Sequence, residues 1–250
     1  MKKSKVTTTS ALLLIILLSA LYIWIVGQNR GDEKNYFHRH LRNYILHSAR
    51  ARAFFNFHGA GDARYEYLRN NQPIELVVSS MAGLESSAEA TNRLAESIAQ
   101  VTGNTVSISF GDTTIPHTYD VTETDLRSMM KGAAVPATAG VVKISVHFLS
   151  RNAERPTLIG LTHRDKAIVV YVDTISADVG NDLRSKNDLL VSTALHEFGH
   201  QLGLEHNDLP GCLMNSSADI NDTLSSNRSM AVTDFCVYEK NLIVQIRTRN

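Results

Sequence analysis

The sequence predicts an α/β fold, in which helices pack on a mixed, twisted sheet, preceded by an apolar helix at the N-terminus. Short runs rich in β-branched residues alternate with stretches of helical periodicity, which is the pattern of an α/β domain. One long apolar run lies apart from these, close to the N-terminus. With 250 residues, of which 43% are hydrophobic, the chain is long enough to bury one sizeable core.

A single domain is predicted over residues 73–250, because the first strand directly follows Pro73. Its strands, which include a short antiparallel strand at one edge of the sheet, are predicted at Ile74–Ser79, Thr105–Phe110, Val141–Leu149, Leu158–Thr162 (the edge strand) and Ala167–Val172. One helix is predicted over Ser86–Val101, where Gly103 ends it. Another helix begins near Asn187, and a C-terminal helix closes the domain.

The apolar run, Ala11–Val26, predicts a transmembrane signal-anchor over residues 11–27, behind a cytoplasmic N-terminus of residues 1–10. A spanning helix needs about 20 apolar residues, so this run is long enough only if the polar residues beside it lie at the interfaces. Lysines at positions 2, 3 and 5 precede the run. The positive-inside rule then leaves the rest of the chain outside the cytoplasmic membrane.

The alternative for this run is a signal peptide that is cleaved. A cleavage site needs small residues, and the best candidate has the bulky Leu18 ahead of Ser19 and Ala20. Both alternatives export the domain to the periplasm or the extracellular space.

Residues 28–72 predict a juxtamembrane helix or stalk. Phe37, Leu41, Tyr44 and Ile45 fall on one stripe at helical spacing. Since the segment is rich in Arg and His, one interpretation is a basic helix that lies on anionic lipid. The other interpretation is a stalk helix that packs on the domain.

Charge and cysteine content limit the classes of function. The chain has 25 Lys and Arg against 25 Asp and Glu, so no global field draws it to nucleic acid, and no nucleic-acid partner is expected. Only two cysteines occur, Cys212 and Cys236. A disulfide is permitted if the domain lies outside the cytoplasm.

The chemistry is concentrated in Leu189–His206, which has the sequence LLVSTALHEFGHQLGLEH and contains H-E-x-x-H-x-x-G-x-x-H. His196 and His200 lie four residues apart, so their imidazoles project from one face of a helix and can bind one ion. Gly203 can adopt the left-handed conformation that ends the helix, which lets His206 return as a third nitrogen ligand. We therefore predict one Zn²⁺ per chain, with a fourth position open for water.

Glu197 directly follows the first of these histidines. It lies about 100° round the helix, where a carboxylate can take a proton from water without binding the metal. Zinc makes water a nucleophile at neutral pH and polarises a carbonyl, so hydrolysis of peptide bonds with Glu197 as general base is the expected chemistry. The opposite stripe of the helix is apolar and would anchor it in the core, through Val191, Leu195, Phe198 and Leu202.

The alternative for these histidines is an ordinary amphipathic helix that carries them by chance. A bare HExxH motif leaves that alternative open, but a motif with five fixed positions, each matched at about 5%, occurs by chance in such a chain with a frequency of about 10⁻⁴. The other histidines lack ligand spacing, and His147 is predicted to be a hydrogen-bonded core residue of its strand. The remaining ones are His38, His40, His47, His58, His117 and His163.

The extended motif resembles the signature of the metzincin clan of zinc metallopeptidases. Met214 stands where that clan has a methionine-containing turn beneath the metal. The string CLMN around it resembles the archaemetzincins most, whereas HEFGHQLGLEH is equally similar to the matrixins. The resemblance implies a zincin-like fold over roughly Pro73–Asn250, with Gly203 and Met214 as supporting residues of the site.

The resemblance also bears on the cysteines. Archaemetzincins carry cysteines that bind a second zinc, one of them directly after the third histidine, where this chain has Asn207. A structural site of that kind needs four thiolates, so a second zinc is not expected. A disulfide between Cys212 and Cys236 fits an exported domain better than free buried thiols, and it would tie the methionine turn to the final helix.

The sequence therefore predicts a membrane-anchored zinc metalloendopeptidase that cleaves proteins or peptides outside the cytoplasmic membrane. One alternative is an inactive, zinc-containing module of the same fold that binds peptides, and another is a membrane-tethered interaction domain without metal. Glu197 favours the enzyme, because a non-catalytic site needs no base. The clan further implies that the strand before the zinc helix, or the edge strand at Leu158–Thr162, pairs with an extended substrate.

Overall fold

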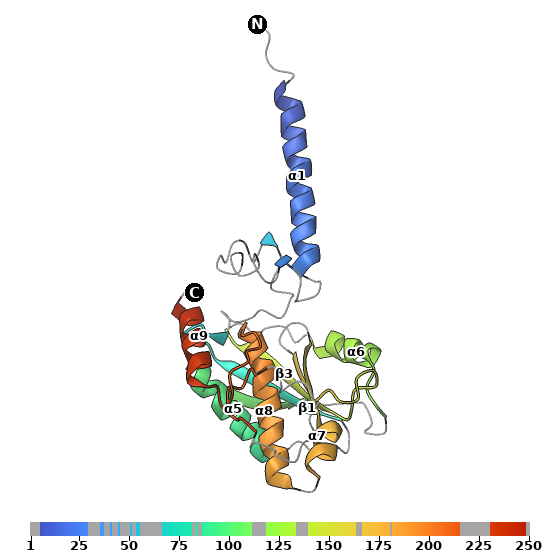
Figure 1. Ribbon diagram of the computed structural model, residues 1–250, viewed down its shortest axis with the longest axis vertical. Helices are drawn as coiled ribbons and strands as arrows, with labels where there is room; N and C mark the ends of the chain where they lie inside the picture. The colour runs from blue at the N-terminus through green and yellow to red at the C-terminus, as the bar shows by residue number, and fades with distance from the viewer. Residues whose placement is uncertain are drawn as a thin grey trace. The chain divides into compact units, whose positions relative to one another are not determined.

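The computed structural model describes residues 6–29, 36–37, 41, 45, 51, 54–55, 67–81, 84, 87–111, 119–133, 140–163, 167–180, 182–215 and 231–248 (Figure 1). These residues belong to two compact units, Met1–Ala60 and Gly61–Asn250. The helix predicted over residues 28–72 lies mostly outside the described residues. Five of the histidines lie outside them as well, namely His38, His40, His47, His58 and His117.

The first unit contains α1 (Val6–Asn29), a helix that covers the predicted apolar run. The six apolar side chains from Leu13 to Leu18 are between 55% and 66% exposed. Ile25 and Phe37 are buried in a small cluster of their own. Among the described residues, no helix is both long enough and apolar enough to cross a membrane, so the span predicted over residues 11–27 finds no support there.

The second unit is built on a five-stranded sheet in the order β2-β1-β3-β5-β4. The strands are β1 (Ile74–Ser80), β2 (Val106–Gly111), β3 (Val142–Leu149), β4 (Gly160–His163) and β5 (Ala167–Tyr171). The first three and β5 run parallel, while β4 pairs antiparallel with β5 at the edge. The predicted mixed sheet with an antiparallel edge strand is therefore confirmed.

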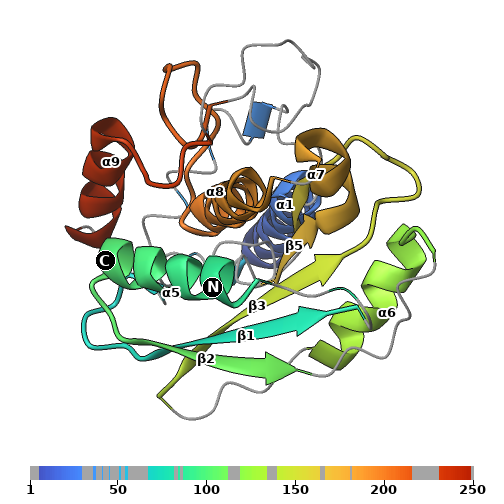
Figure 2. The same ribbon diagram turned by 90° about the horizontal axis from the view of Figure 1, so that it is seen from below.

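Two long helices lie on one face of this sheet, α5 (Ala88–Thr102) and α8 (Leu183–Gln201) (Figure 2). They contact each other, and α8 also lies against β4 and β5. Ser87 caps the start of α5 by accepting a hydrogen bond from Ala90 N, and Gly103, with φ 68°, ends it. The apolar stripe of α8 is buried as predicted, with Val191, Leu195, Phe198 and Leu202 at most 1% exposed.

The helix that carries the motif begins earlier than predicted. α8 starts at Leu183 rather than near Asn187, because Asp182 caps it by accepting a hydrogen bond from Arg184 N. Apart from the exposed Leu183, the first turn is polar, so apolar periodicity alone could not detect it. The preceding helix, α7 (Val172–Val179), also takes over Val172, which the prediction had placed in a strand.

A helix that the sequence prediction missed, α6 (Glu123–Ala133), forms in the connection between β2 and β3. Asp125 N donates to Thr122 Oγ1, and Thr122 N donates to the Asp125 carboxylate. This reciprocal pair is a capping box, with aspartate in the place of the usual glutamate. The Thr122 hydroxyl also donates to this carboxylate, and the two bonds that the carboxylate accepts, from the hydroxyl and from Thr122 N, lower the pKa of Asp125. The spacing of Thr122 and Asp125 is the sequence signal that could have revealed the helix.

His147 of β3 lies in the core, at 5% exposed. The prediction of a hydrogen-bonded histidine is wrong in one respect, because neither ring nitrogen has a hydrogen-bond partner among the described residues. Burial disfavours the charged imidazole and lowers the pKa of His147 from 6.5 to about 4.

The variant His147→Leu is expected to weaken the pH dependence of stability. Below about pH 6.5 the unfolded chain protonates this imidazole, whereas the folded protein keeps it neutral down to about pH 4, so stability falls as the pH falls through that window. By about pH 5 the loss from this residue is about 2 kcal/mol. Urea unfolding in EDTA, near pH 7.5 and near pH 5, measures how much unfolding free energy the wild type and the variant each lose between the two pH values. An equal loss in wild type and variant would contradict the assignment.

Candidate metal centre

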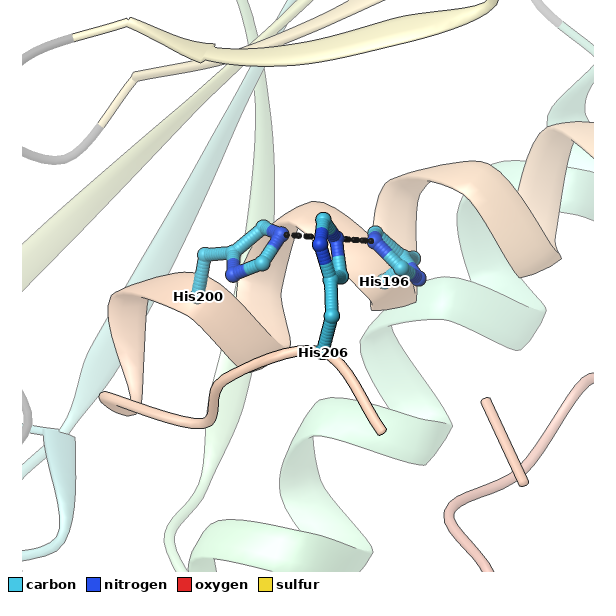
Figure 3. Close-up of side chains that lie close together, drawn as sticks. All are labelled: His196, His200 and His206. Carbon is cyan, nitrogen blue, oxygen red and sulfur yellow. Dashed lines mark hydrogen bonds between the residues drawn. The ribbon is translucent and has the colours of Figure 1, made fainter. Parts of the chain in front are cut away.

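Three histidines meet at the C-terminal end of α8 (Figure 3). His196 and His200 project from successive turns of the helix, and His206 returns from the loop that follows it. His206 Nε2 lies 3.1 Å from His196 Nε2 and 3.1 Å from His200 Nε2. The structure thus brings together the three side chains that the motif predicted as ligands.

The turn after α8 makes this return possible. Gly203 has a φ of 81°, in the left-handed region that glycine adopts without steric cost. Gly203 N donates to His200 O and Leu204 N donates to Gly199 O, each at 2.9 Å. These bonds satisfy carbonyls that would otherwise be left open at the end of the helix.

Backbone carbonyls set the tautomers of two of the histidines. His196 Nδ1 lies 2.8 Å from Leu213 O, and His200 Nδ1 lies 3.1 Å from Leu204 O. A carbonyl oxygen can only accept, so each Nδ1 carries the proton and each Nε2 presents a lone pair. This is the state in which imidazole binds a metal.

The spacing of the three Nε2 atoms fits zinc. Zn–N bonds of about 2.0–2.1 Å in a tetrahedral arrangement place neighbouring nitrogens about 3.3 Å apart. The two separations of 3.1 Å are close to that value. Lone pairs that face one another at this distance repel each other unless a cation lies between them. His196, His200 and His206 are therefore the residues that could hold the metal.

Glu197 lies beside the histidines on α8 and is 5% exposed. Thr162 Oγ1, on the edge strand β4, lies 2.7 Å from Glu197 Oε2 and 2.8 Å from Glu197 O. A Cβ atom at Gly160 would lie 2.4 Å from Thr193 Cγ2 and 2.9 Å from Glu197 Oε1. The edge strand thus packs directly against the predicted base, and glycine at position 160 allows this close approach.

Met214 is fully buried beneath α8. A Cβ atom at Gly199 would lie 2.3 Å from Met214 Sδ and 3.2 Å from Phe235 Cε1, so a side chain at position 199 would displace the methionine. The sequence prediction assigned no role to Gly199. The signal in the sequence was a residue without a side chain directly before His200, inside the last turn of α8.

The variant Gly199→Ala is expected to destabilise the domain by about 2 kcal/mol, because the new methyl group collides with Met214. Helix propensity alone predicts the opposite, a gain of about 1 kcal/mol. Urea unfolding of the two proteins decides between them. The further change Met214→Ala removes the colliding atoms, so it should cost less in Gly199→Ala than in wild type. A variant as stable as wild type would contradict the packing argument.

Glu239, on α9 (Val237–Thr248), holds the methionine turn, and the sequence prediction missed it. Its carboxylate is 1% exposed and accepts hydrogen bonds from the backbone N–H groups of Leu213, Met214 and Cys236, at 3.2, 2.7 and 2.8 Å. Asn207 Nδ2 lies 3.2 Å from the same group. Glutamate three residues after Cys236 has the spacing of a helix cap, but that spacing does not reveal the contact with the turn.

Two further links tie the methionine turn to its surroundings. Cys212 and Cys236 form a disulfide, which joins the turn to the start of α9. Asn207 N donates to Met214 O at 2.8 Å, so the residue after His206 is bound to the turn. Together with the bond from His196 to Leu213 O, these links connect both ends of the metal motif to one turn.

Tyr67 packs against the C-terminal part of α8. Its hydroxyl donates to Gln201 Oε1 at 2.8 Å, and its ring centroid lies 5.5 Å from that of Phe198. Tyr67 and Gln201 are both fully buried. The segment predicted as a stalk, residues 28–72, therefore supplies a core residue of the domain.

A sequence profile of the matrixin family matches residues 102–235, which is more than half of the chain and includes the whole motif and the methionine turn. The chain belongs to the matrixin family. This matrixin is a zinc metallopeptidase of the metzincin clan, and its substrates are proteins or peptides. A search of curated proteins finds no match.

Among solved structures, the archaemetzincin of Methanopyrus kandleri is similar in fold to this matrixin, with a TM-score of 0.52 and 17% identity over 72% of this chain and 99% of the other. The archaemetzincin of Archaeoglobus fulgidus, complexed with malonate, is 17% identical over 67% and 98%, with a TM-score of 0.44. Metalloproteinase-II from Bacteroides fragilis is 11% identical over 71% and 54%, with a TM-score of 0.40. The first likeness shows the archaemetzincin-like, zincin-like fold that the sequence predicted.

Proposed function

We propose that this matrixin hydrolyses internal peptide bonds with one zinc ion, held by His196, His200 and His206, and with Glu197 as the general base. The observation that carries the proposal is the convergence of the three Nε2 atoms at the end of the helix that also carries Glu197. Zinc at such a site lowers the pKa of water to about 7 and polarises the scissile carbonyl. Glu197 takes the proton from the attacking water and passes it to the leaving amine.

The test is zinc content and peptide cleavage of the full chain. Elemental analysis should find one zinc per chain, and a mixed peptide library should be cleaved at internal bonds. Removal of the metal with a chelator should abolish cleavage, and added zinc should restore it. A protein that holds zinc and cleaves nothing would instead be the inactive peptide-binding module. A protein that holds no zinc would refute the metal site.

We also propose that the substrate backbone pairs with β4. This strand has β5 as its partner and lies against α8 beside Glu197, so an extended peptide added to its outer edge would pass the general base. Gly160→Pro is a poor test of this pairing, because a side chain at position 160 would also push against Glu197.

Substrate N-methylation is the sharper test of strand pairing. Each lost backbone hydrogen bond is expected to raise KM about tenfold, while kcat changes little. Since neighbouring amides of a strand point in opposite directions, the effect should alternate along the peptide. A set of peptides methylated at one amide each measures this, and an effect that is uniform along the peptide would contradict pairing with β4.

We propose further that the domain lies outside the cytoplasmic membrane and that α1 attaches it to the bilayer. Two observations support this proposal, namely the disulfide between Cys212 and Cys236, which an oxidising compartment favours, and the exposed apolar side chains of α1. Carbonate extraction of membranes that carry the full chain tests the attachment. The full chain should stay in the pellet, and its release into the supernatant would refute attachment.

A further inference from the structure

We propose that Thr162 is a positioning residue for the general base, whose hydroxyl holds the Glu197 carboxylate in the orientation that accepts a proton. The inference deepens the proposed function and rests on the role given there to Glu197. It goes beyond the zinc motif, because Thr162 lies on a different element, 35 positions away in the chain.

The register of the edge strand aims the Thr162 side chain at α8. Thr162 pairs with Ile168 and Gly160 pairs with Val170, both across the β4–β5 ladder. Residues two apart in a strand point to the same side. An added Cβ at Gly160 would meet Thr193 and Glu197, so this side of β4 is the one that faces the helix.

The carboxylate of Glu197 lies along this strand. Its Oε1 atom is the one beside Gly160, and its Oε2 atom lies 2.7 Å from Thr162 Oγ1. A hydroxyl that donates to a carboxylate makes a charge-assisted bond, which is shorter and stronger than a neutral one. The Glu197 main-chain oxygen, at 2.8 Å, lies within reach of the same hydroxyl.

This bond restrains a part of Glu197 that the helix does not. α8 fixes the backbone of Glu197, but the torsion that rotates its carboxylate has a broad energy profile. A hydrogen bond to one oxygen selects one orientation. Loss of this bond removes one restraint on that torsion, and proton transfer requires a well-aligned base.

The kinetic test compares Thr162→Val with Thr162→Ser in the full, zinc-loaded chain. Valine has nearly the same shape and lacks the hydroxyl, so kcat should fall about tenfold or more with little change in KM. Serine keeps the hydroxyl and should keep kcat within about threefold. A valine variant with wild-type kcat, a loss seen only in KM, or a serine variant as slow as the valine variant would each overturn the proposal.

Thr193→Val is the matched control. Thr193 lies one turn before Glu197 on α8, also next to Gly160, and its buried hydroxyl has no hydrogen-bond partner among the described residues. The same chemical change there should leave kcat near the wild-type value. If it lowers kcat as much as Thr162→Val does, packing rather than the hydrogen bond explains the loss, and the proposal fails.

A second measurement does not depend on activity. In the metal-free protein, Thr162→Val should lower the urea midpoint in wild type and should lower it less in the Glu197→Ala background, because the two side chains are coupled. Equal shifts in the two backgrounds would overturn the proposal. This measurement applies even if the valine variant has too little activity for kinetics. If wild type itself cleaves no peptide, the proposed function fails, whereas the coupling of the two residues is still measured.

Discussion

Glu197→Ala is expected to lower kcat about 10³-fold or more and to leave the zinc in place. The three histidines that bind the metal are untouched by the substitution, but no carboxylate is left to take the proton from the attacking water. Elemental analysis and peptide cleavage, measured on one preparation, give the two results. Activity that survives the substitution would show that the base is misassigned.

Glu205→Ala is the matched control for this variant. Glu205 lies within the same motif, directly before His206, but its side chain is exposed. Removal of this charge should change kcat less than about threefold, since a solvated surface carboxylate interacts weakly with the site. Loss of zinc from Glu197→Ala would mean instead that Glu197 supports the metal site and would leave its role as base unproven.

Glu239→Ala is expected to lower the free energy of unfolding by about 3–5 kcal/mol. The substitution leaves the backbone N–H groups of Leu213, Met214 and Cys236 without their acceptor, and each buried donor left unsatisfied costs about 1–3 kcal/mol. Urea unfolding in EDTA measures the effect on the protein alone. A loss below about 1 kcal/mol would show that water or rearrangement replaces the carboxylate.

The same variant should bind zinc about 10–100-fold more weakly. Leu213 O orients the His196 ring, and Leu213 N donates to Glu239. Without Glu239 the turn is less firmly held, so the His196 ring is less well oriented to bind the metal. Glu239→Gln keeps one acceptor oxygen and should fall between the two proteins. Glu96→Ala, an exposed glutamate of α5, is the control and should change stability by no more than about 0.5 kcal/mol.

The elements that the sequence predicted well are those with a strong local pattern. All the predicted strands form, and apart from the edge strand β4 they are short runs rich in β-branched residues. The burial of the apolar stripe of α8 was also predicted correctly, because its apolar residues recur in the sequence with the helical period of 3.6. The first turn of α8 and the whole of α6 were missed, because hydrogen-bonded caps rather than apolar periodicity begin them.

The sequence by itself determined which side chains are the candidate metal ligands and general base, namely His196, His200, His206 and Glu197. They lie within eleven consecutive residues, where the helical repeat alone places two imidazoles on one face and a glycine turns the chain back. Local geometry of this kind depends on the neighbours in the chain and on little else.

Only the tertiary structure decided which distant residues hold those groups in place. Thr162 reaches Glu197 because the β4–β5 register aims it there, and Glu239 reaches the methionine turn because α9 packs beside it. Gly160 and Gly199 matter for the space they leave to other side chains, which no local pattern records. Contacts of this kind follow from strand register and packing over the whole domain, which is why a local pattern predicts the ligands but not their supports.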